Sequence, residues 1–178
     1  TFRDNVPGKK PVSLDNTNKL IRFYNGAIGL KTGYTNAAGH CLSAAAERDG
    51  LLMIAVVLGE PDSNTRFAEA RKLMDYGFAN YEAVVVDNKG EAVQEVEINN
   101  GLKKSVVAQF KDDVKLVVKK GSKDKINRIV IMATDIKAPV KAGETIGVVT
   151  YTLEGREIGK AELVAAEDVP KATFGKLF

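Results

Sequence analysis

Regularly spaced turn signals divide the second half of the sequence into short β-rich runs. Apolar and polar residues alternate along these runs, and Gly or Asn turns separate them at intervals of about ten residues. This spacing is typical of a small all-β sandwich or barrel-like domain, which we expect over residues 83–178. The expected strands are Ala83–Val86, Val93–Ile98, Ser105–Gln109, Val114–Val118, Arg128–Ala133, Thr145–Leu153 and Glu157–Val164, followed by a tail over Ala166–Phe178.

The first part of the chain, residues 1–82, has a different pattern. The polar segment up to Leu20 is expected to be a loop with at most a short extended piece. Two apolar runs around the turn Arg48-Asp49-Gly50 predict a hairpin, with one strand before it. The strands expected here are Ile28–Thr35, His40–Glu47 and Leu51–Leu58. Three- and four-residue spacing then predicts an amphipathic helix over Thr65–Asn80, built on Phe67, Ala70, Leu73, Met74 and Phe78.

Composition excludes several functions. The net charge of +3 is too small to indicate a nucleic-acid partner. The single cysteine, Cys41, excludes an internal disulfide framework, and with the single histidine, His40, it argues against a metal site. No signal-peptide pattern and no run of about 18 apolar residues is present.

The segment around Lys31 carries the candidate chemistry. On a strand, Gly29, Lys31 and Gly33 share one face, so the lysine has clearance on both sides. A ligand backbone could approach such a strand closely, and an exposed edge there could pair with an extended peptide.

Lys31-Thr32-Gly33 is the K-T-G tripeptide shared by class A β-lactamases and penicillin-binding proteins. The longer string from Gly29 to Gly59, GLKTGYTNAAGHCLSAAAERDGLLMIAVVLG, closely resembles the low-molecular-mass penicillin-binding proteins, the serine-type D-alanyl-D-alanine carboxypeptidases. Asn64–Phe78 looks like the helix that closes their catalytic domain, and the β-rich remainder looks like their C-terminal domain. The resemblance implies an α+β chain: the last strands and helix of a penicillin-binding/β-lactamase-like catalytic domain over residues 1–82, then a small all-β domain over 83–178.

The resemblance also implies roles for particular residues. Lys31 would be the electrostatic, proton-relay lysine, and the Thr32 hydroxyl would bind the terminal carboxylate of the substrate. Gly33 would line the substrate-binding site, and the backbone N–H of Tyr34 would be one of the hydrogen-bond donors of the oxyanion hole. Arg66 matches a family arginine near the carboxylate pocket. No cofactor and no metal is expected.

One element of the family's machinery is not found in this sequence. The nucleophilic serine of an S-x-x-K motif and an S-x-N motif would both precede the K-T-G strand, but neither occurs in the 30 residues before Lys31. Ser122 and Lys125 have the S-x-x-K spacing, but they follow the K-T-G motif in an expected polar turn, and we reject them. Both chain ends look cut, so we expect a catalytically incomplete fragment that associates with its missing N-terminal part or with a swapped neighbour.

The expected partners are peptidoglycan stem peptides ending in D-Ala-D-Ala and β-lactams, without nucleic acid. The expected location is the extracytoplasmic bacterial envelope, with membrane attachment through a segment beyond Phe178, which Lys171–Phe178 would approach. Other interpretations stay open. Lys31 and Arg66 would be solvated surface residues, and His40 and Cys41 structural ones, in a non-enzymatic envelope-associated module. A class A β-lactamase relative is disfavoured by the β-rich second half.

Overall fold

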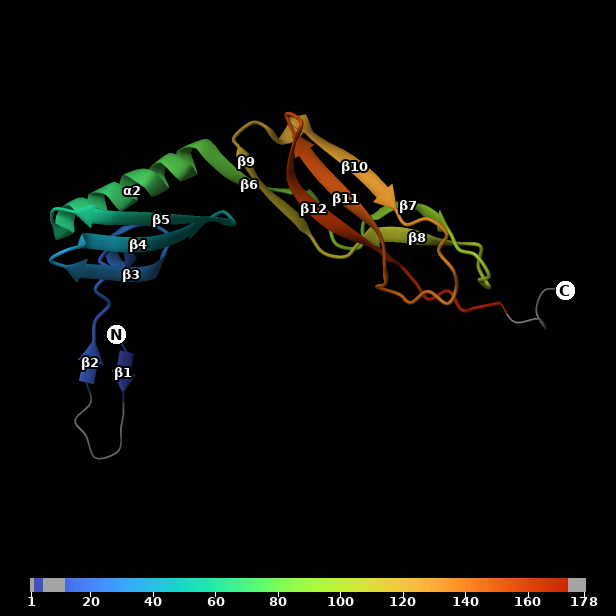
Figure 1. The fold of residues 1–178 in the computed structure, drawn as a ribbon, viewed down its shortest axis with the longest axis horizontal. Coiled ribbons are helices and arrows are strands. Elements are labelled where there is room, and N and C mark those ends of the chain that lie inside the picture. The colour runs from blue at the N-terminus through green and yellow to red at the C-terminus, as the bar shows by residue number, and fades with distance from the viewer. Residues whose placement is uncertain (1, 5–11, 173–178) are drawn as a thin grey trace. The chain divides into compact units, whose positions relative to one another are not determined.

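The computed structural model describes residues 2–4 and 12–172. They form two compact units that divide between Glu82 and Ala83 (Figure 1). Strands dominate both units, and the long helix belongs to the first, so the predicted α+β class is confirmed. None of the helices in this part of the chain is long and apolar enough to cross a membrane.

The N-terminal segment contains more regular structure than expected. β1 (Phe2–Asp4) and β2 (Val12–Leu14) pair antiparallel, and α1 (Leu20–Phe23) forms a single helical turn. The prediction of a loop with at most a short extended piece up to Leu20 is therefore wrong, because two short strands pair within this segment. Elements of three or four residues are too short to produce a visible hydrophobic period.

A three-stranded antiparallel sheet forms the centre of the first unit. Its order is β3 (Ala27–Thr35), β4 (Gly39–Arg48) and β5 (Leu51–Glu60), and α2 (Ser63–Asn80) lies along it (Figure 1). Alanines on the covered sheet face leave room for the helix to approach closely. The buried residues of this core are Leu20, Tyr24, Leu42, Ala44, Ala46, Ala55, Val57, Phe67, Ala70 and Met74.

Two features of α2 bear on the site. Asp62 caps the helix, because its Oδ1 accepts hydrogen bonds from the backbone of Asn64 and Thr65 at 2.7 and 3.0 Å. This cap fixes the first turn, which contains Arg66. The prediction that Leu73 belongs to the apolar face is wrong, because its side chain is 53% exposed while its neighbour Met74 fills the core.

Every β-rich run expected in the second unit forms a strand, with ends shifted by at most two residues. A five-stranded antiparallel sheet has the order β10-β11-β12-β8-β7, and β6 pairs with β9. β6 begins directly after α2, without a linker. The bounds are β6 (Tyr81–Asp87), β7 (Ala92–Glu97), β8 (Ser105–Phe110), β9 (Val114–Lys119), β10 (Ile126–Met132), β11 (Thr145–Leu153) and β12 (Arg156–Ala165).

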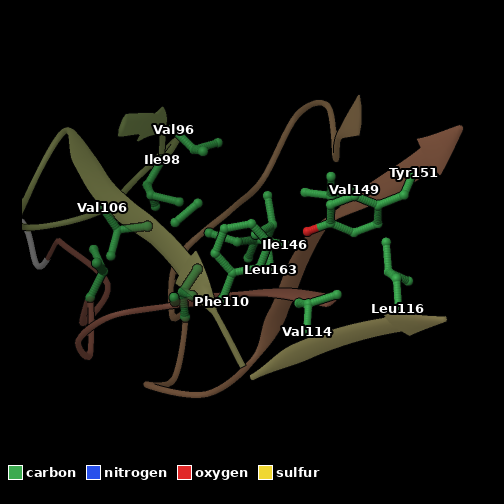
Figure 2. Packing of buried hydrophobic residues seen from close by; sticks show 14 of the residues in the cluster. Val96, Ile98, Val106, Phe110, Val114, Leu116, Ile146, Val149, Tyr151 and Leu163 are labelled. Carbon is green, nitrogen blue, oxygen red and sulfur yellow. The ribbon is translucent and has the colours of Figure 1, made fainter. Parts of the chain in front are cut away.

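Figure 2 shows the core of this second unit. Phe110 and Tyr151 are its largest side chains, and valine, leucine and isoleucine side chains fill the space around them. Val169 is also completely buried and exchanges backbone hydrogen bonds with Val140. The prediction that residues from 166 onward form a tail is therefore wrong for 166–172. The expected approach to a membrane helix lies mostly over 173–178, outside the described residues.

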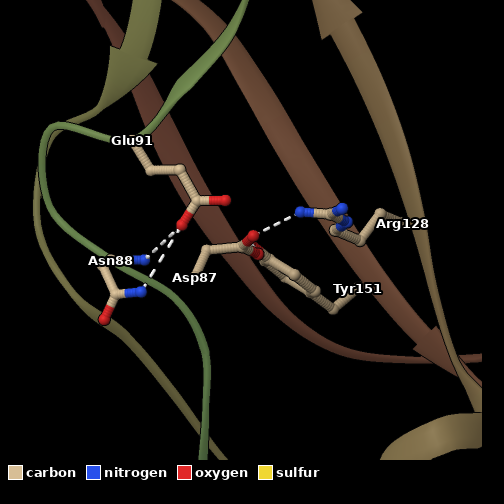
Figure 3. A network of polar contacts seen from close by, with 5 residues as sticks. All are labelled: Asp87, Asn88, Glu91, Arg128 and Tyr151. Carbon is tan, nitrogen blue, oxygen red and sulfur yellow. Dashed lines mark hydrogen bonds and ion pairs between the residues drawn. The ribbon is translucent and has the colours of Figure 1, made fainter.

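One buried carboxylate connects three strands of the second unit. Asp87, at the end of β6, accepts a hydrogen bond from the Tyr151 hydroxyl of β11 at 2.5 Å and pairs with Arg128 of β10 (Figure 3). Asp87 and Tyr151 are almost fully buried. Burial, together with the bond to Asp87, raises the pKa of Tyr151. Both partners compensate for the removal of the carboxylate from water.

Candidate active site

The K-T-G residues lie on β3, at an edge of the first unit's sheet. Among the described strands, only β4 pairs with β3, so the other side of β3 is open. The pairing places Lys31 opposite Ser43 and Gly33 opposite Cys41. Directly paired residues share a face, so Lys31 and Gly33 point away from the face that α2 covers.

Lys31 is exposed, and its ammonium donates a hydrogen bond to the carbonyl oxygen of Thr32 at 2.7 Å. Above Gly33 the space is nearly empty, because a Cβ added there would meet only the Cβ of Cys41, at 3.8 Å. The strand therefore presents a cation beside an unobstructed stretch of backbone. This arrangement can receive an extended, negatively charged ligand.

Thr32 lies on the opposite face, across from Leu42, and is 9% exposed. Its hydroxyl oxygen is 2.7 Å from the hydroxyl oxygen of Thr17, and either can be the donor. The next residue, Asn18, is buried and accepts a hydrogen bond from the backbone of Leu20 at 3.1 Å, which fixes the loop that carries Thr17. Thr17 and Asn18 could not be predicted as site residues, because they belong to no periodic pattern and to no recognised motif in the sequence.

Tyr34, the residue after the motif, is exposed and contacts the strand next to it. Its ring centroid is 4.4 Å from that of His40, and its hydroxyl donates to Asn36 Oδ1 at 3.0 Å. His40 and Cys41 both lie on β4 beside the motif. The Cys41 thiol points to the backbone oxygens of the preceding turn, at 3.5 Å from that of Ala38.

Arg66 is brought to the motif by the first turn of α2. Its Nη1 donates to the carbonyl oxygens of Gly33 at 3.1 Å and Cys41 at 3.4 Å. Its Nη2 donates to Ser63 Oγ at 3.1 Å, and the side chain is buried. The guanidinium thus connects the ends of β3 and β4 to the helix.

The rejected S-x-x-K residues belong to the second unit. Ser122 precedes a single 3₁₀ turn (Lys123–Lys125) of the second unit, and Lys125 is the last residue of that turn. Within the described residues, no group of three or more His, Cys, Asp and Glu side chains could hold a metal ion.

The sheet face opposite α2 is apolar and uncovered. Its exposed side chains on β5 are Leu52, Ile54, Val56 and Leu58. Exposed apolar patches of this kind are typical of surfaces that bind another protein segment, a membrane or a ligand.

The K-T-G strand, the capped helix and the β domain are the elements that the resemblance to penicillin-binding proteins predicts, and comparisons with known proteins agree. Residues 81–171 match the family described as penicillin-binding protein 5, C-terminal domain, and residues 1–62 match D-alanyl-D-alanine carboxypeptidase. The chain belongs to the low-molecular-mass penicillin-binding proteins, as the C-terminal portion of such a protein.

Individual relatives cover most of the chain. It is 32% identical over 162 residues to D-alanyl-D-alanine carboxypeptidase DacF of Bacillus subtilis, covering 90% of this chain and 42% of the relative. It is 35% identical over 153 residues to DacA of Haemophilus influenzae, covering 84% of this chain and 39% of the relative. The crystal structure of penicillin-binding protein 5 from Haemophilus influenzae aligns with a TM-score of 0.70 at 32% identity, over 80% of this chain and 42% of that one. The chain thus spans less than half the length of these relatives.

Proposed function

We propose that this chain contributes the K-T-G strand and the C-terminal β domain of a serine-type D-alanyl-D-alanine carboxypeptidase. The whole enzyme would remove the terminal D-alanine from peptidoglycan stem peptides through an acyl-enzyme intermediate, and β-lactams would acylate the same serine. The observation that carries this proposal is the K-T-G motif on an open strand edge, with Lys31 exposed. Family membership and the names of the relatives support it.

Different residues of β3 would bind the substrate and assist proton transfer. The Lys31 ammonium would lower the energy of negative charge on the substrate and on reacting oxygens. The Thr32 hydroxyl would donate to the terminal carboxylate of the substrate. Gly33 would allow the substrate backbone to lie against the strand, and the Tyr34 N–H would be one of two oxyanion donors.

The proposed role of Arg66 follows from its contacts. Its guanidinium bonds the Gly33 and Cys41 carbonyls, so it would position the K-T-G strand and add positive potential near the carboxylate of the substrate. A bond from Arg66 to the carboxylate itself would require a rearrangement of these contacts.

The nucleophile would come from polypeptide outside this sequence. We propose that this polypeptide, from the same protein or from a swapped neighbour, covers the apolar face formed by Leu52, Ile54, Val56 and Leu58. The envelope location and membrane attachment beyond Phe178 are also proposals, supported by the family relationship alone.

A fluorescent penicillin tests the proposed function. This chain alone should remain unlabelled, whereas a longer polypeptide that contains it and an upstream S-x-x-K serine should be labelled at that serine. In the longer polypeptide, Lys31→Ala should slow labelling about a hundredfold or more, whereas Lys104→Ala, an exposed lysine of the β domain, should not. Covalent labelling of this chain alone, or full labelling of the Lys31 variant, would contradict the proposal.

A further inference from the structure

The five-stranded sheet of the second unit has two edges, which differ in how they are protected. At one edge, β7 carries the exposed carboxylates Glu95 and Glu97, and its pairing with β8 shifts register between Ala92 and Gln94. Charges and irregular pairing are the usual means by which proteins prevent an edge strand from pairing with another chain.

The other edge, β10, is paired regularly and carries one charged residue, Arg128, which is already paired with Asp87. It pairs in one continuous register with β11 from Ile126 to Met132, and no other described strand pairs with it. Its central residues Ile129, Val130 and Ile131 are 51%, 38% and 61% exposed. An exposed, regular and apolar edge of this length is a template for another strand.

The charge distribution along β10 selects the kind of strand that fits. Arg128 is the only charged residue of β10, and Asp87 already pairs with it (Figure 3). A strand rich in acidic or basic residues would find no complementary charge here. A second apolar strand of the same composition would bring no like charges into direct opposition.

We propose that β10 pairs antiparallel with β10 of a second copy of this chain, around a two-fold axis at Val130. In this register Ile129 faces Ile131 of the second copy, Val130 faces its own equivalent, and Arg128 faces Met132. A register centred on Ile129 would instead place Val130 against Arg128 and Ile131 against Asn127, so two of the three exposed apolar residues would lose their apolar partners. The pairing is isologous, so it closes as a dimer and does not extend into a fibre. It is independent of the proposed enzymatic function.

Cysteine cross-linking tests both the pairing and its register. In a Cys41→Ser background, Val130→Cys places two thiols directly opposite each other across the axis, at a separation that a disulfide can span. Ile129→Cys places its two thiols diagonally, so mild oxidation should yield covalent dimer about tenfold less efficiently than with Val130→Cys. Equal cross-linking of the two variants, or no cross-linking of Val130→Cys, would overturn the proposal.

Sedimentation equilibrium of the full chain gives an independent measurement. Val130→Lys brings two like charges together at the axis and should raise the dimer dissociation constant about tenfold or more. Val117→Lys changes a similarly exposed valine on β9 and should leave dimerisation unchanged. A monomeric wild-type chain at about 100 µM, or a Val130→Lys chain that associates like wild type, would refute pairing through β10.

Discussion

The hydroxyl oxygen of Thr17 lies 2.7 Å from the hydroxyl oxygen of Thr32, so a loop residue contacts the middle residue of the K-T-G motif. A carboxylate only accepts hydrogen bonds, and a threonine hydroxyl has a single hydrogen. If Thr32 is to donate to a carboxylate, Thr17 must donate to Thr32. Thr17 would therefore be a positioning residue that orients the hydroxyl hydrogen of Thr32.

The first prediction concerns this pair, in an active polypeptide that contains the chain. Thr17→Val keeps the side-chain shape but cannot donate, so kcat/KM for a D-Ala-D-Ala peptide should fall about tenfold, mainly through a higher KM. Thr17→Ser keeps the hydroxyl and should retain nearly wild-type kinetics. Equal impairment of the serine and valine variants would show that the methyl group of Thr17 matters and its hydrogen bond does not.

The second prediction concerns Arg66. Arg66→Ala leaves the carbonyls of Gly33 and Cys41 without their buried donor, so the free energy of unfolding of the first unit should fall by about 2 kcal/mol. Hydrogen exchange of the amides in β3 should accelerate accordingly. Arg71→Ala, on the exposed side of the same helix, should change neither quantity measurably. If the Arg66→Ala variant shows unchanged hydrogen exchange of the β3 amides, Arg66 does not position the K-T-G strand.

The regular spacing of apolar residues makes much of this fold predictable from the sequence. The strands β3, β4 and β5 and the helix α2 are long enough to appear in the sequence as β-rich or apolar runs or as a period of 3.6, and the expected bounds differ from the observed ones by at most two residues. The strand of the K-T-G motif and the hairpin after it are therefore predicted by the sequence, and the edge position of β3 comes from the structure. Leu73 shows the limit, because its spacing fits the apolar face but its neighbour Met74 takes the buried position.

Contacts between segments whose apolar residues show no regular spacing could not be predicted from the sequence. Thr17 meets Thr32 across 15 positions of sequence, and the loop that holds it is fixed by hydrogen bonds of Asn18. Val169 is buried because an isolated bridge pairs it with Val140, and no alternation in the sequence marks either residue as a strand. Such contacts depend on three-dimensional packing and have no local signal.

The third prediction uses two glycines with the same backbone conformation. Gly26 and Gly50 both have φ of +76°, but a Cβ at Gly26 would lie 2.3 Å from the backbone oxygen of Glu47, whereas a Cβ at Gly50 meets nothing within 4 Å. Gly50→Ala should therefore cost about 1 kcal/mol of strain, and Gly26→Ala should cost clearly more, because the backbone of β4 must move. Urea unfolding measures both costs. Equal destabilisation would mean that the clash at Gly26 relaxes freely.

The fourth prediction concerns pH. Burial and the hydrogen bond to Asp75 raise the pKa of Tyr24 from 10.0 to about 12, so the folded state favours the neutral phenol. Its contribution to stability is complete below pH 10 and is lost as the pH rises from 10 toward 12, because only the unfolded chain readily releases the proton there. Tyr24→Phe should flatten the fall in unfolding free energy between pH 10 and about 12, whereas Tyr76→Phe, an exposed tyrosine of α2, should keep the wild-type slope.

The fifth prediction concerns the carboxylate of Asp87 in the second unit. Asp87→Ala removes the acceptor of the buried Tyr151 hydroxyl and the partner of Arg128, so the unfolding free energy of this unit should fall by about 3 kcal/mol. Tyr151→Phe removes one donor and leaves the pair with Arg128, and should cost about 1–2 kcal/mol. Asp124→Ala, in an exposed 3₁₀ turn, is the matched control and should have almost no effect. If the Asp87 variant unfolds at the same urea concentration as the Asp124 variant, the buried network does not stabilise the unit.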